Sequence, residues 1–69
     1  MSGLLVMVTT PPEVRRLVLV DSDDHGRAIL ATMAALNTDA SEKVTVVGVV
    51  EDAVLAAFHV PPNGARLAF

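Results

Sequence analysis

The stretch that decides the fold is Leu17-Val18-Leu19-Val20-Asp21-Ser22-Asp23-Asp24-His25-Gly26, which passes from an apolar run through an acidic turn into an alanine-rich segment. Residues 17–20 are apolar at every position, which indicates a central strand covered on both faces. Ser22 is a suitable N-cap, and the next two aspartates place negative charge on the first turn, where the helix dipole favours it. With Asn37 available for the left-handed position that ends a helix, we expect a helix over about 23–36.

This predicted helix has two unlike faces. Large side chains recur at helical spacing along one face, which is the expected core face: Ile29, Leu30, Met33 and Leu36. The opposite face carries small residues in place of the usual Glu and Lys: Ala28, Ala31, Thr32 and Ala35. Alanine is the best helix former and tolerates water, so this face could simply be solvated. Alternatively, a second element or another subunit lies against it, which makes these four residues candidate interface residues.

Two further segments have the pattern of strands. Residues 4–8 form a short apolar run that ends before two prolines, and its separation from 17–20 suits a hairpin or a short crossover. We favour the hairpin. The segment 44–50 is almost wholly β-branched and is the clearest strand in the chain. Gly48 within it suggests a bulge or a close approach by another backbone.

The last part of the chain contains a strong turn signal. Residues 53–60 fit either a short helix or a strand, and the sequence leaves both open. The turn Pro61-Pro62-Asn63-Gly64 follows, and residues 65–69 then have the pattern of a strand. We expect this strand to dock in its own sheet or on the edge of a neighbouring copy, which adds Leu67 and Phe69 to the candidate interface.

Together these elements predict an α+β fold in a single domain, 1–69. The expected architecture is a small two-layer domain of four to five short strands with one main helix packed across the sheet. The alternative is an α/β unit, in which residues 17–50 form a β-α-β succession.

The composition indicates that the chain has a partner. A chain of 69 residues buries only about 60% of the surface that its unfolded form exposes. Yet 52% of the residues are hydrophobic, and no cysteine is present to replace a core with disulfides. Apolar side chains must therefore remain on the surface, where contiguous apolar area normally marks an interface. The simplest partner is another copy of the chain.

Charge and aromatic content argue against nucleic acid and membrane. The net charge is −3, the five Lys and Arg residues are scattered, and only 3% of the residues are aromatic, so neither a basic stripe nor a stacking platform is present. The first residues lack the positive region of a signal peptide, and no uncharged apolar run approaches about 18 residues. We expect a soluble, cytoplasmic protein.

Five carboxylates follow the two predicted central strands: Asp21, Asp23, Asp24, Glu51 and Asp52. If these strands are parallel neighbours, the carboxylates meet at the sheet edge where open α/β sheets bind ligands, and they could hold Mg²⁺ or Ca²⁺. Capping and solubility explain the same residues without a metal. The two histidines have no metal-ligand spacing, and no Ser or Thr stands in a recognisable catalytic motif, so we expect neither cofactor nor catalysis.

Residues 17–57 resemble the first half of a bacterial response-regulator receiver domain. The resemblance is carried by a strand with an acidic end, a helix, a second strand and a second helix: 17–23, 23–36, 44–50 and 51–57. It implies that Asp21, with Asp23 as a second candidate, matches the acids that hold Mg²⁺ in that family. Ser22 interrupts the usual acid pair, and residues 65–69 contain no acid to accept a phosphoryl group.

The sequence therefore predicts a non-enzymatic assembly or protein-binding module, folded as a homo-oligomer or as a small structural subunit of a larger complex. The alternative that follows from the resemblance is a regulatory domain that acts by protein binding through the acidic turn 21–24.

Overall fold

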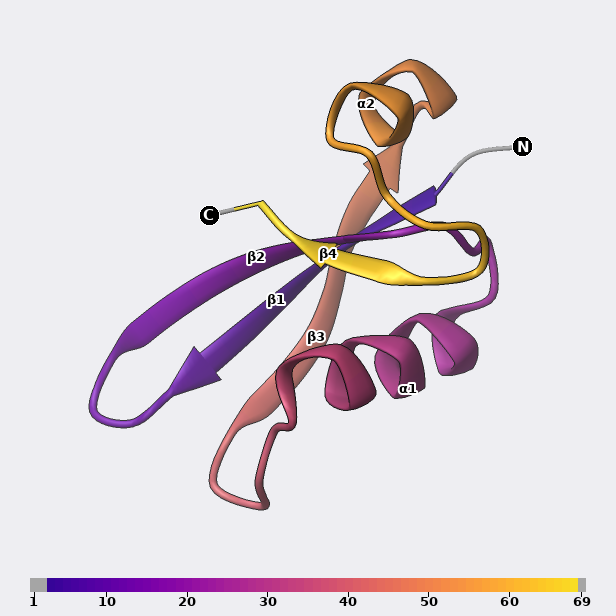
Figure 1. Ribbon diagram of the computed structural model, residues 1–69. Coiled ribbons are helices and arrows are strands. Elements are labelled where there is room, and N and C mark those ends of the chain that lie inside the picture. Colours follow the sequence, from indigo (N-terminus) through magenta and orange to yellow (C-terminus); the bar gives the residue numbers. More distant parts are fainter. Residues whose placement is uncertain (1–2, 69) are drawn as a thin grey trace.

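The computed structural model describes residues 3–68, which form a four-stranded antiparallel sheet and two helices (Figure 1). The predicted α+β fold, with one main helix packed on the sheet, is confirmed. In chain order the elements are β1 (Gly3–Thr10), β2 (Val14–Val20), α1 (His25–Leu36), β3 (Lys43–Val50), α2 (Asp52–Ala57) and β4 (Ala65–Leu67). The segment 53–60, which the sequence left open, begins as the short helix α2.

The sheet has the strand order β3-β1-β2-β4. Strands β1 and β2 form the expected hairpin, with Leu4 opposite Val20 and Thr10 opposite Val14. Strand β3 pairs antiparallel with the other side of β1, so β2 and β3 run parallel to each other with β1 between them. The succession β2-α1-β3 is thus a crossover between strands that are not neighbours.

Strand β3 contains the bulge that Gly48 suggested. Gly48 lies opposite Leu5 and Val46 lies opposite Val6, which leaves Val47 without a partner in β1. A Cβ added at Gly48 would have no other atom within 4 Å, so no backbone approaches this glycine closely. Of the two alternatives, the structure therefore shows the bulge and not the close contact.

The C-terminal strand docks in its own sheet. Ala65 of β4 lies opposite Val20, and the N–H of Ala68 donates to the carbonyl oxygen of Leu17 at 2.8 Å. This short strand forms one edge and leaves β2 in the interior, as the sequence predicted for residues 17–20. Phe69, one of the candidate interface residues, lies outside the described residues.

The main core lies between α1 and the sheet. Alternate side chains of β1 and β2 point into it, and α1 contributes Ala28 and Thr32. The hydroxyl of Thr32 donates to the carbonyl oxygen of Ala28 at 2.8 Å, so its burial leaves that donor satisfied. The largest fully buried side chains are all β-branched: Val6, Val8, Val18, Val20 and Thr32.

The orientation of α1 corrects the sequence prediction. Leu30 is 67% exposed and Met33 is 41% exposed, so the prediction that they face the core is wrong. The helix instead turns Ala28 and Thr32 to the sheet, because small side chains let it approach a surface already filled by valines. Leu36, from the predicted core face, is partly buried against the same core, as is Ala31. Ala28 and Thr32 are covered by the sheet of their own chain and are therefore not available to another subunit.

The ends of α1 are set by residues near those expected. Asp24, rather than Ser22, is the N-cap, and its Oδ1 accepts from the N–H of Arg27 at 3.0 Å. The Oγ of Ser22 accepts instead from the N–H of Asp24 at 3.2 Å, one step before the helix. Asn37 takes the predicted left-handed conformation at the C-terminal end, with φ 51°.

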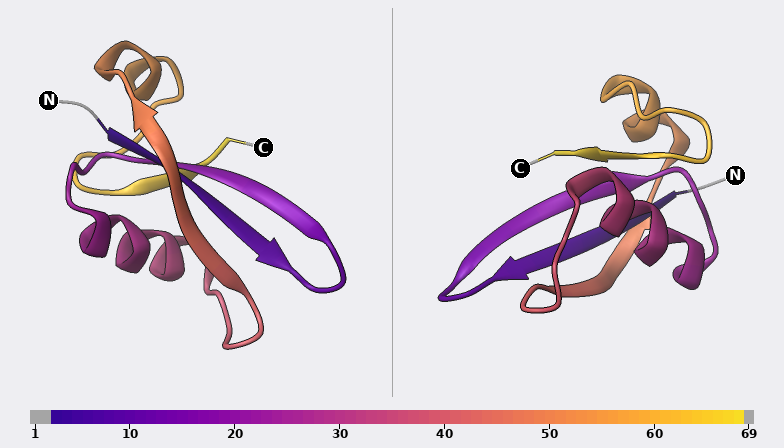
Figure 2. Two further views of the ribbon diagram at one scale, coloured as in Figure 1. Left: turned by 180° about the vertical axis from the view of Figure 1, so that it is seen from behind. Right: turned by 60° about the horizontal axis from the view of Figure 1, so that its bottom comes forward.

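The second helix covers one end of the other sheet face (Figure 2). Leu55 of α2 packs there with Leu19 and Val50, and the three form a smaller buried cluster. Helices α1 and α2 therefore lie on opposite sides of the sheet. Neither helix of the described part of the chain is long and apolar enough to span a membrane.

A polar network joins the hairpin to the loop between α1 and β3. An Nη2–Oε2 distance of 2.7 Å links Arg16 to Glu42, and the hydroxyl of Thr10 donates to the same carboxylate oxygen at 2.7 Å. The other carboxylate oxygen of Glu42 accepts from the N–H of Asp39 at 3.1 Å.

Candidate functional site

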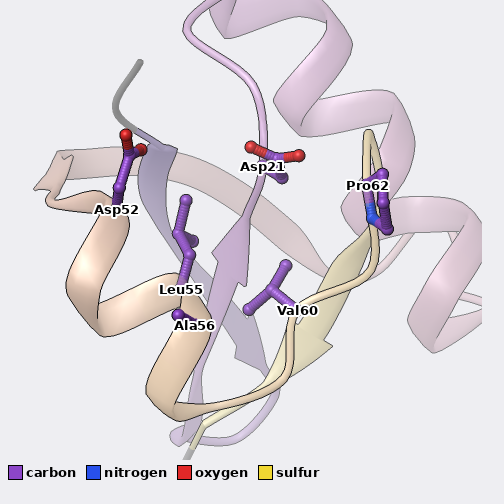
Figure 3. Close-up of a pocket in the computed structure, with 6 residues that line it drawn as sticks. All are labelled: Asp21, Asp52, Leu55, Ala56, Val60 and Pro62. Atoms are coloured by element: carbon purple, nitrogen blue, oxygen red, sulfur yellow. The ribbon is translucent and has the colours of Figure 1, made fainter.

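Two of the five candidate carboxylates share one hollow. Asp21 follows β2, and Asp52 begins α2, with only Glu51 between it and the end of β3. Because β2 and β3 run parallel, both aspartates lie at the same end of the sheet, and both line a hollow of about 320 Å³ (Figure 3). The rest of its lining is apolar: Leu55, Ala56, Val60 and Pro62.

The contacts of Asp21 are structural. Its Oδ2 accepts from the N–H of Asn63 at 3.0 Å, and its own N–H donates to the carbonyl oxygen of Gly64 at 2.9 Å. These bonds hold the turn before β4 against the end of β2. Asp21 therefore acts as an anchor for the C-terminal strand.

The other three carboxylates do not join this hollow. Asp24 caps α1, while Asp23 and Glu51 are exposed. Among residues 3–68, no group of three His, Cys, Asp or Glu side chains lies close enough together to hold a metal ion. The five carboxylates therefore do not gather at one edge as the parallel-neighbour arrangement would require, because β1 lies between the two strands that were expected to be neighbours.

An apolar groove of about 340 Å³ lies on the sheet face turned away from α1. The lining comes from strands β1, β2 and β3, from helix α2, and from residues that follow β3, α2 and β4. The lining residues are Leu5, Leu17, Leu19, Val49, Val50, Glu51, Val54, Phe58 and Ala68. Glu51 is the single charged residue in this set. Two of the lining side chains are large, apolar and well exposed, namely Phe58 at 39% and Val54 at 38%.

The sequence predicted surplus apolar surface but placed the interface on the small face of α1 and on the C-terminal strand. A signal for the groove was nevertheless present. The runs 4–8 and 17–20 are apolar at every position, so each presents apolar side chains to both faces of the sheet. One main helix can cover one face only, and a helix of six residues covers no more than part of the other.

The remaining candidate interface residues lie apart from one another. Ala31 is partly buried against the main core, and Ala35 is exposed on α1. Leu67 is exposed on β4, at the edge of the sheet opposite to β3. They do not form one patch with the apolar groove.

The comparisons with known proteins add no constraint. The resemblance of residues 17–57 to a receiver domain stays a prediction. Comparison of the chain with known protein families, with curated proteins and with solved structures found no match.

Proposed function

We propose that this chain is a non-enzymatic assembly module that works as a homo-oligomer, with the apolar groove and the adjoining strand β3 as its contact surface. The observation that carries the proposal is the sheet face turned away from α1. There Leu5 and Leu17 are only partly covered, and Val54 and Phe58 of the α2 region stand exposed beside them. Contiguous apolar surface of this kind normally marks an interface.

The chain has enough surface to form an interface of ordinary size. A stable interface buries about 800 Å² on each partner. That is less than a fifth of the 4416 Å² of accessible surface on this chain. Small domains without disulfides often draw their missing stability from oligomerisation, so a second copy would supply what the small core lacks.

The test is the mass of the protein in solution, measured by light scattering after size exclusion across a hundredfold range of concentration. The expected result is a stable multiple of 7.2 kDa. Phe58→Ser should shift the protein towards the monomer, because it removes an apolar side chain from the groove. Leu30→Ser is the matched control, since Leu30 is also exposed but lies on the far side of the sheet.

A monomer at every concentration would overturn the proposal, as would an equal loss of mass in both variants. The acidic turn 21–24 would then be the surface to test for a protein partner.

A further inference from the structure

We propose that two copies of this chain pack face to face through the outer face of the sheet, which is the side turned away from α1. Helix α2 of each copy then rests on the part of that face which the partner's own α2 leaves open. The two-fold axis lies between the two sheets and runs across the strands. This inference rests on the proposed self-assembly and specifies its geometry.

The register of the strands shows which side chains lie on the outer face. Leu4, Val6 and Val8 of β1 pack in the core beneath α1, so the residues that alternate with them point to the outer face. Residues directly opposite one another in an antiparallel pair point to the same face. Three rows of the outer face follow from the pairings: Lys43-Thr9-Arg15, Thr45-Met7-Leu17 and Gly48-Leu5-Leu19.

The bulge in β3 changes the alternation of side chains along that strand. Val46, before the bulge, packs against the main core, whereas Val50, after it, belongs to the cluster beneath α2. The extra residue between the two halves of the strand shifts which positions point to which face. Thr45 therefore shares the outer face with Val50, while Val49, opposite Leu4, points to the α1 side.

Helix α2 covers only one end of the outer face (Figure 2). Its Leu55 packs on Leu19 and Val50, while the row Thr45-Met7-Leu17 is only partly covered. Rows two residues apart along a strand are separated by about 7 Å, and packed helices lie about 8–10 Å apart. The two rows beyond α2 therefore have room for one more helix. None is left among residues 3–68 to fill it, because α1 lies on the other side of the sheet.

The exposed side of α2 faces the groove that separates this helix from the open rows. Val54 and Phe58 line the groove from α2 and its C-terminal end, and Leu17 lines it from the sheet. A two-fold axis across the strands turns one copy end for end, so the partner's α2 comes to rest on the row that contains Leu17. Val54 and Phe58 of both copies then meet between the two helices. An axis along the strands would instead place α2 against α2 and leave the open rows in water.

The two ends of the outer face carry opposite charges. At the α2 end, Asp21 and Asp52 line the hollow described above (Figure 3), and Glu51 lines the groove. Among residues 3–68, no Lys or Arg lines either of these two hollows. At the other end, Lys43 and Arg15 lie in the last row, and both are exposed. The outer face is thus acidic at one end and basic at the other.

The same two-fold axis matches these charged ends. Turning one copy end for end lays its acidic end over the basic end of the partner, and the symmetry repeats the match. Electrostatic complementarity of this kind fixes the orientation in which two partners bind. Two other charges stand outside the two ends: Arg66 is on the edge strand β4, opposite Leu19, and Glu13 is in the hairpin turn.

Charge reversal tests the match of the two ends. Lys43→Glu replaces a cation at the basic end with a carboxylate, which faces the acidic end of the partner at two symmetric places. It should raise the dissociation constant of the dimer on the order of tenfold, measured by light scattering over a dilution series. Arg27→Glu is the matched control, because it makes the same change of net charge on α1, on the other side of the sheet. An equal rise in both variants, or none in Lys43→Glu, would contradict the arrangement.

Thiol labelling tests which face is covered, because the natural chain contains no cysteine. Thr45→Cys places a thiol on an open row of the outer face, and Val49→Cys places one on the α1 side of the same strand. The thiol at position 45 should lose its reactivity towards a polar maleimide as rising protein concentration fills the dimer. The thiol at position 49 should react at the same rate at every concentration.

The outcomes separate this inference from the proposed function. A chain that is dimeric by light scattering, but whose thiol at position 45 stays reactive, overturns the face-to-face packing and leaves self-assembly standing. Protection at position 49 in place of position 45 overturns it as well, because the contact would then lie on the α1 side. A chain that is monomeric at every concentration overturns both proposals. Circular dichroism of each variant confirms that the fold is retained.

Discussion

Gly3 has little room for a side chain. A Cβ added there would overlap the carbonyl oxygen of Val20 and lie 2.9 Å from two methyl carbons of Leu55. The carbonyl belongs to the paired strand and cannot move aside like the end of a flexible side chain. We expect Gly3→Ala to lower the free energy of unfolding by about 1–3 kcal/mol, measured by urea denaturation.

Gly48→Ala is the matched control for this change. A Cβ at Gly48 meets no other atom within 4 Å, so the free energy of unfolding should stay within about 0.5 kcal/mol of the natural chain. Equal losses at the two glycines would show that chain flexibility, rather than the close approach at Gly3, sets the effect.

The ionisation of Glu42 is linked to the fold through its hydrogen bonds. The hydrogen bond from the Thr10 hydroxyl, followed by the N–H of Asp39, holds the pKa of Glu42 below its ordinary value. A carboxyl whose pKa is lower in the folded state stabilises the fold above its unfolded pKa of about 4.3. That stabilisation is lost as the pH falls through the lower, folded pKa.

We therefore expect the free energy of unfolding to fall as the pH is lowered from about 6 to 3, and to fall less steeply in Glu42→Gln. Denaturant titrations at a series of pH values measure both slopes. Glu13→Gln makes the same change of charge at the exposed hairpin turn and should keep the natural slope. The hydroxyl of Ser41 also lowers the pKa of Asp39, so a smaller dependence on pH should persist in Glu42→Gln. An unchanged slope in Glu42→Gln would contradict the role assigned to the network.

At the scale of elements, α1 shows what the sequence could and could not predict. Its existence and its end at Asn37 follow from local chemistry, which acts within a few residues. The face that turns towards the sheet does not follow from local chemistry, because both faces lack charges apart from Arg27 at the start of the helix. The choice depends on the sheet, whose valine surface accepts Ala28 and Thr32 closely.

A pair of identical substitutions on the two faces of α1 tests this orientation. Ala28→Gln would force a larger polar side chain into the main core, and we expect a loss of about 2–4 kcal/mol in the free energy of unfolding. Leu30→Gln should change it by no more than about 0.5 kcal/mol, because Leu30 lies mostly in water. Thermal and urea denaturation of both variants provide the measurement. The reverse order of losses would mean that α1 packs through its large residues.

The strands were more predictable than their order. The runs near 4–8, 17–20 and 44–50 stand out by composition, and the two prolines between the first pair favour a hairpin. The place of β1 between β2 and β3 depends on contacts between distant segments, which no local pattern records. Because β1 lies between the two strands that the acids follow, the five carboxylates do not gather into one cluster, and only Asp21 and Asp52 share a hollow.

At the scale of the whole molecule, the proposed self-assembly would link stability to concentration. When folded chains associate and unfolded chains do not, mass action raises the midpoint of thermal unfolding with protein concentration. We expect the midpoint to rise over a hundredfold increase in concentration, as measured by calorimetry or circular dichroism. In Phe58→Ser, the midpoint should rise less with protein concentration. A midpoint that is the same at every concentration would show that a single chain unfolds alone.

The β-branched core has a consequence for entropy. The five largest fully buried side chains are four valines and one threonine. Rotation about χ1 is already restricted in such residues before folding, so little rotamer freedom is lost when they are buried. A core of long, flexible side chains would lose more rotamer freedom for the same buried area. A domain this small thus offsets its limited buried area with side chains that are stiff from the outset, and its interior should hold a single rotameric arrangement.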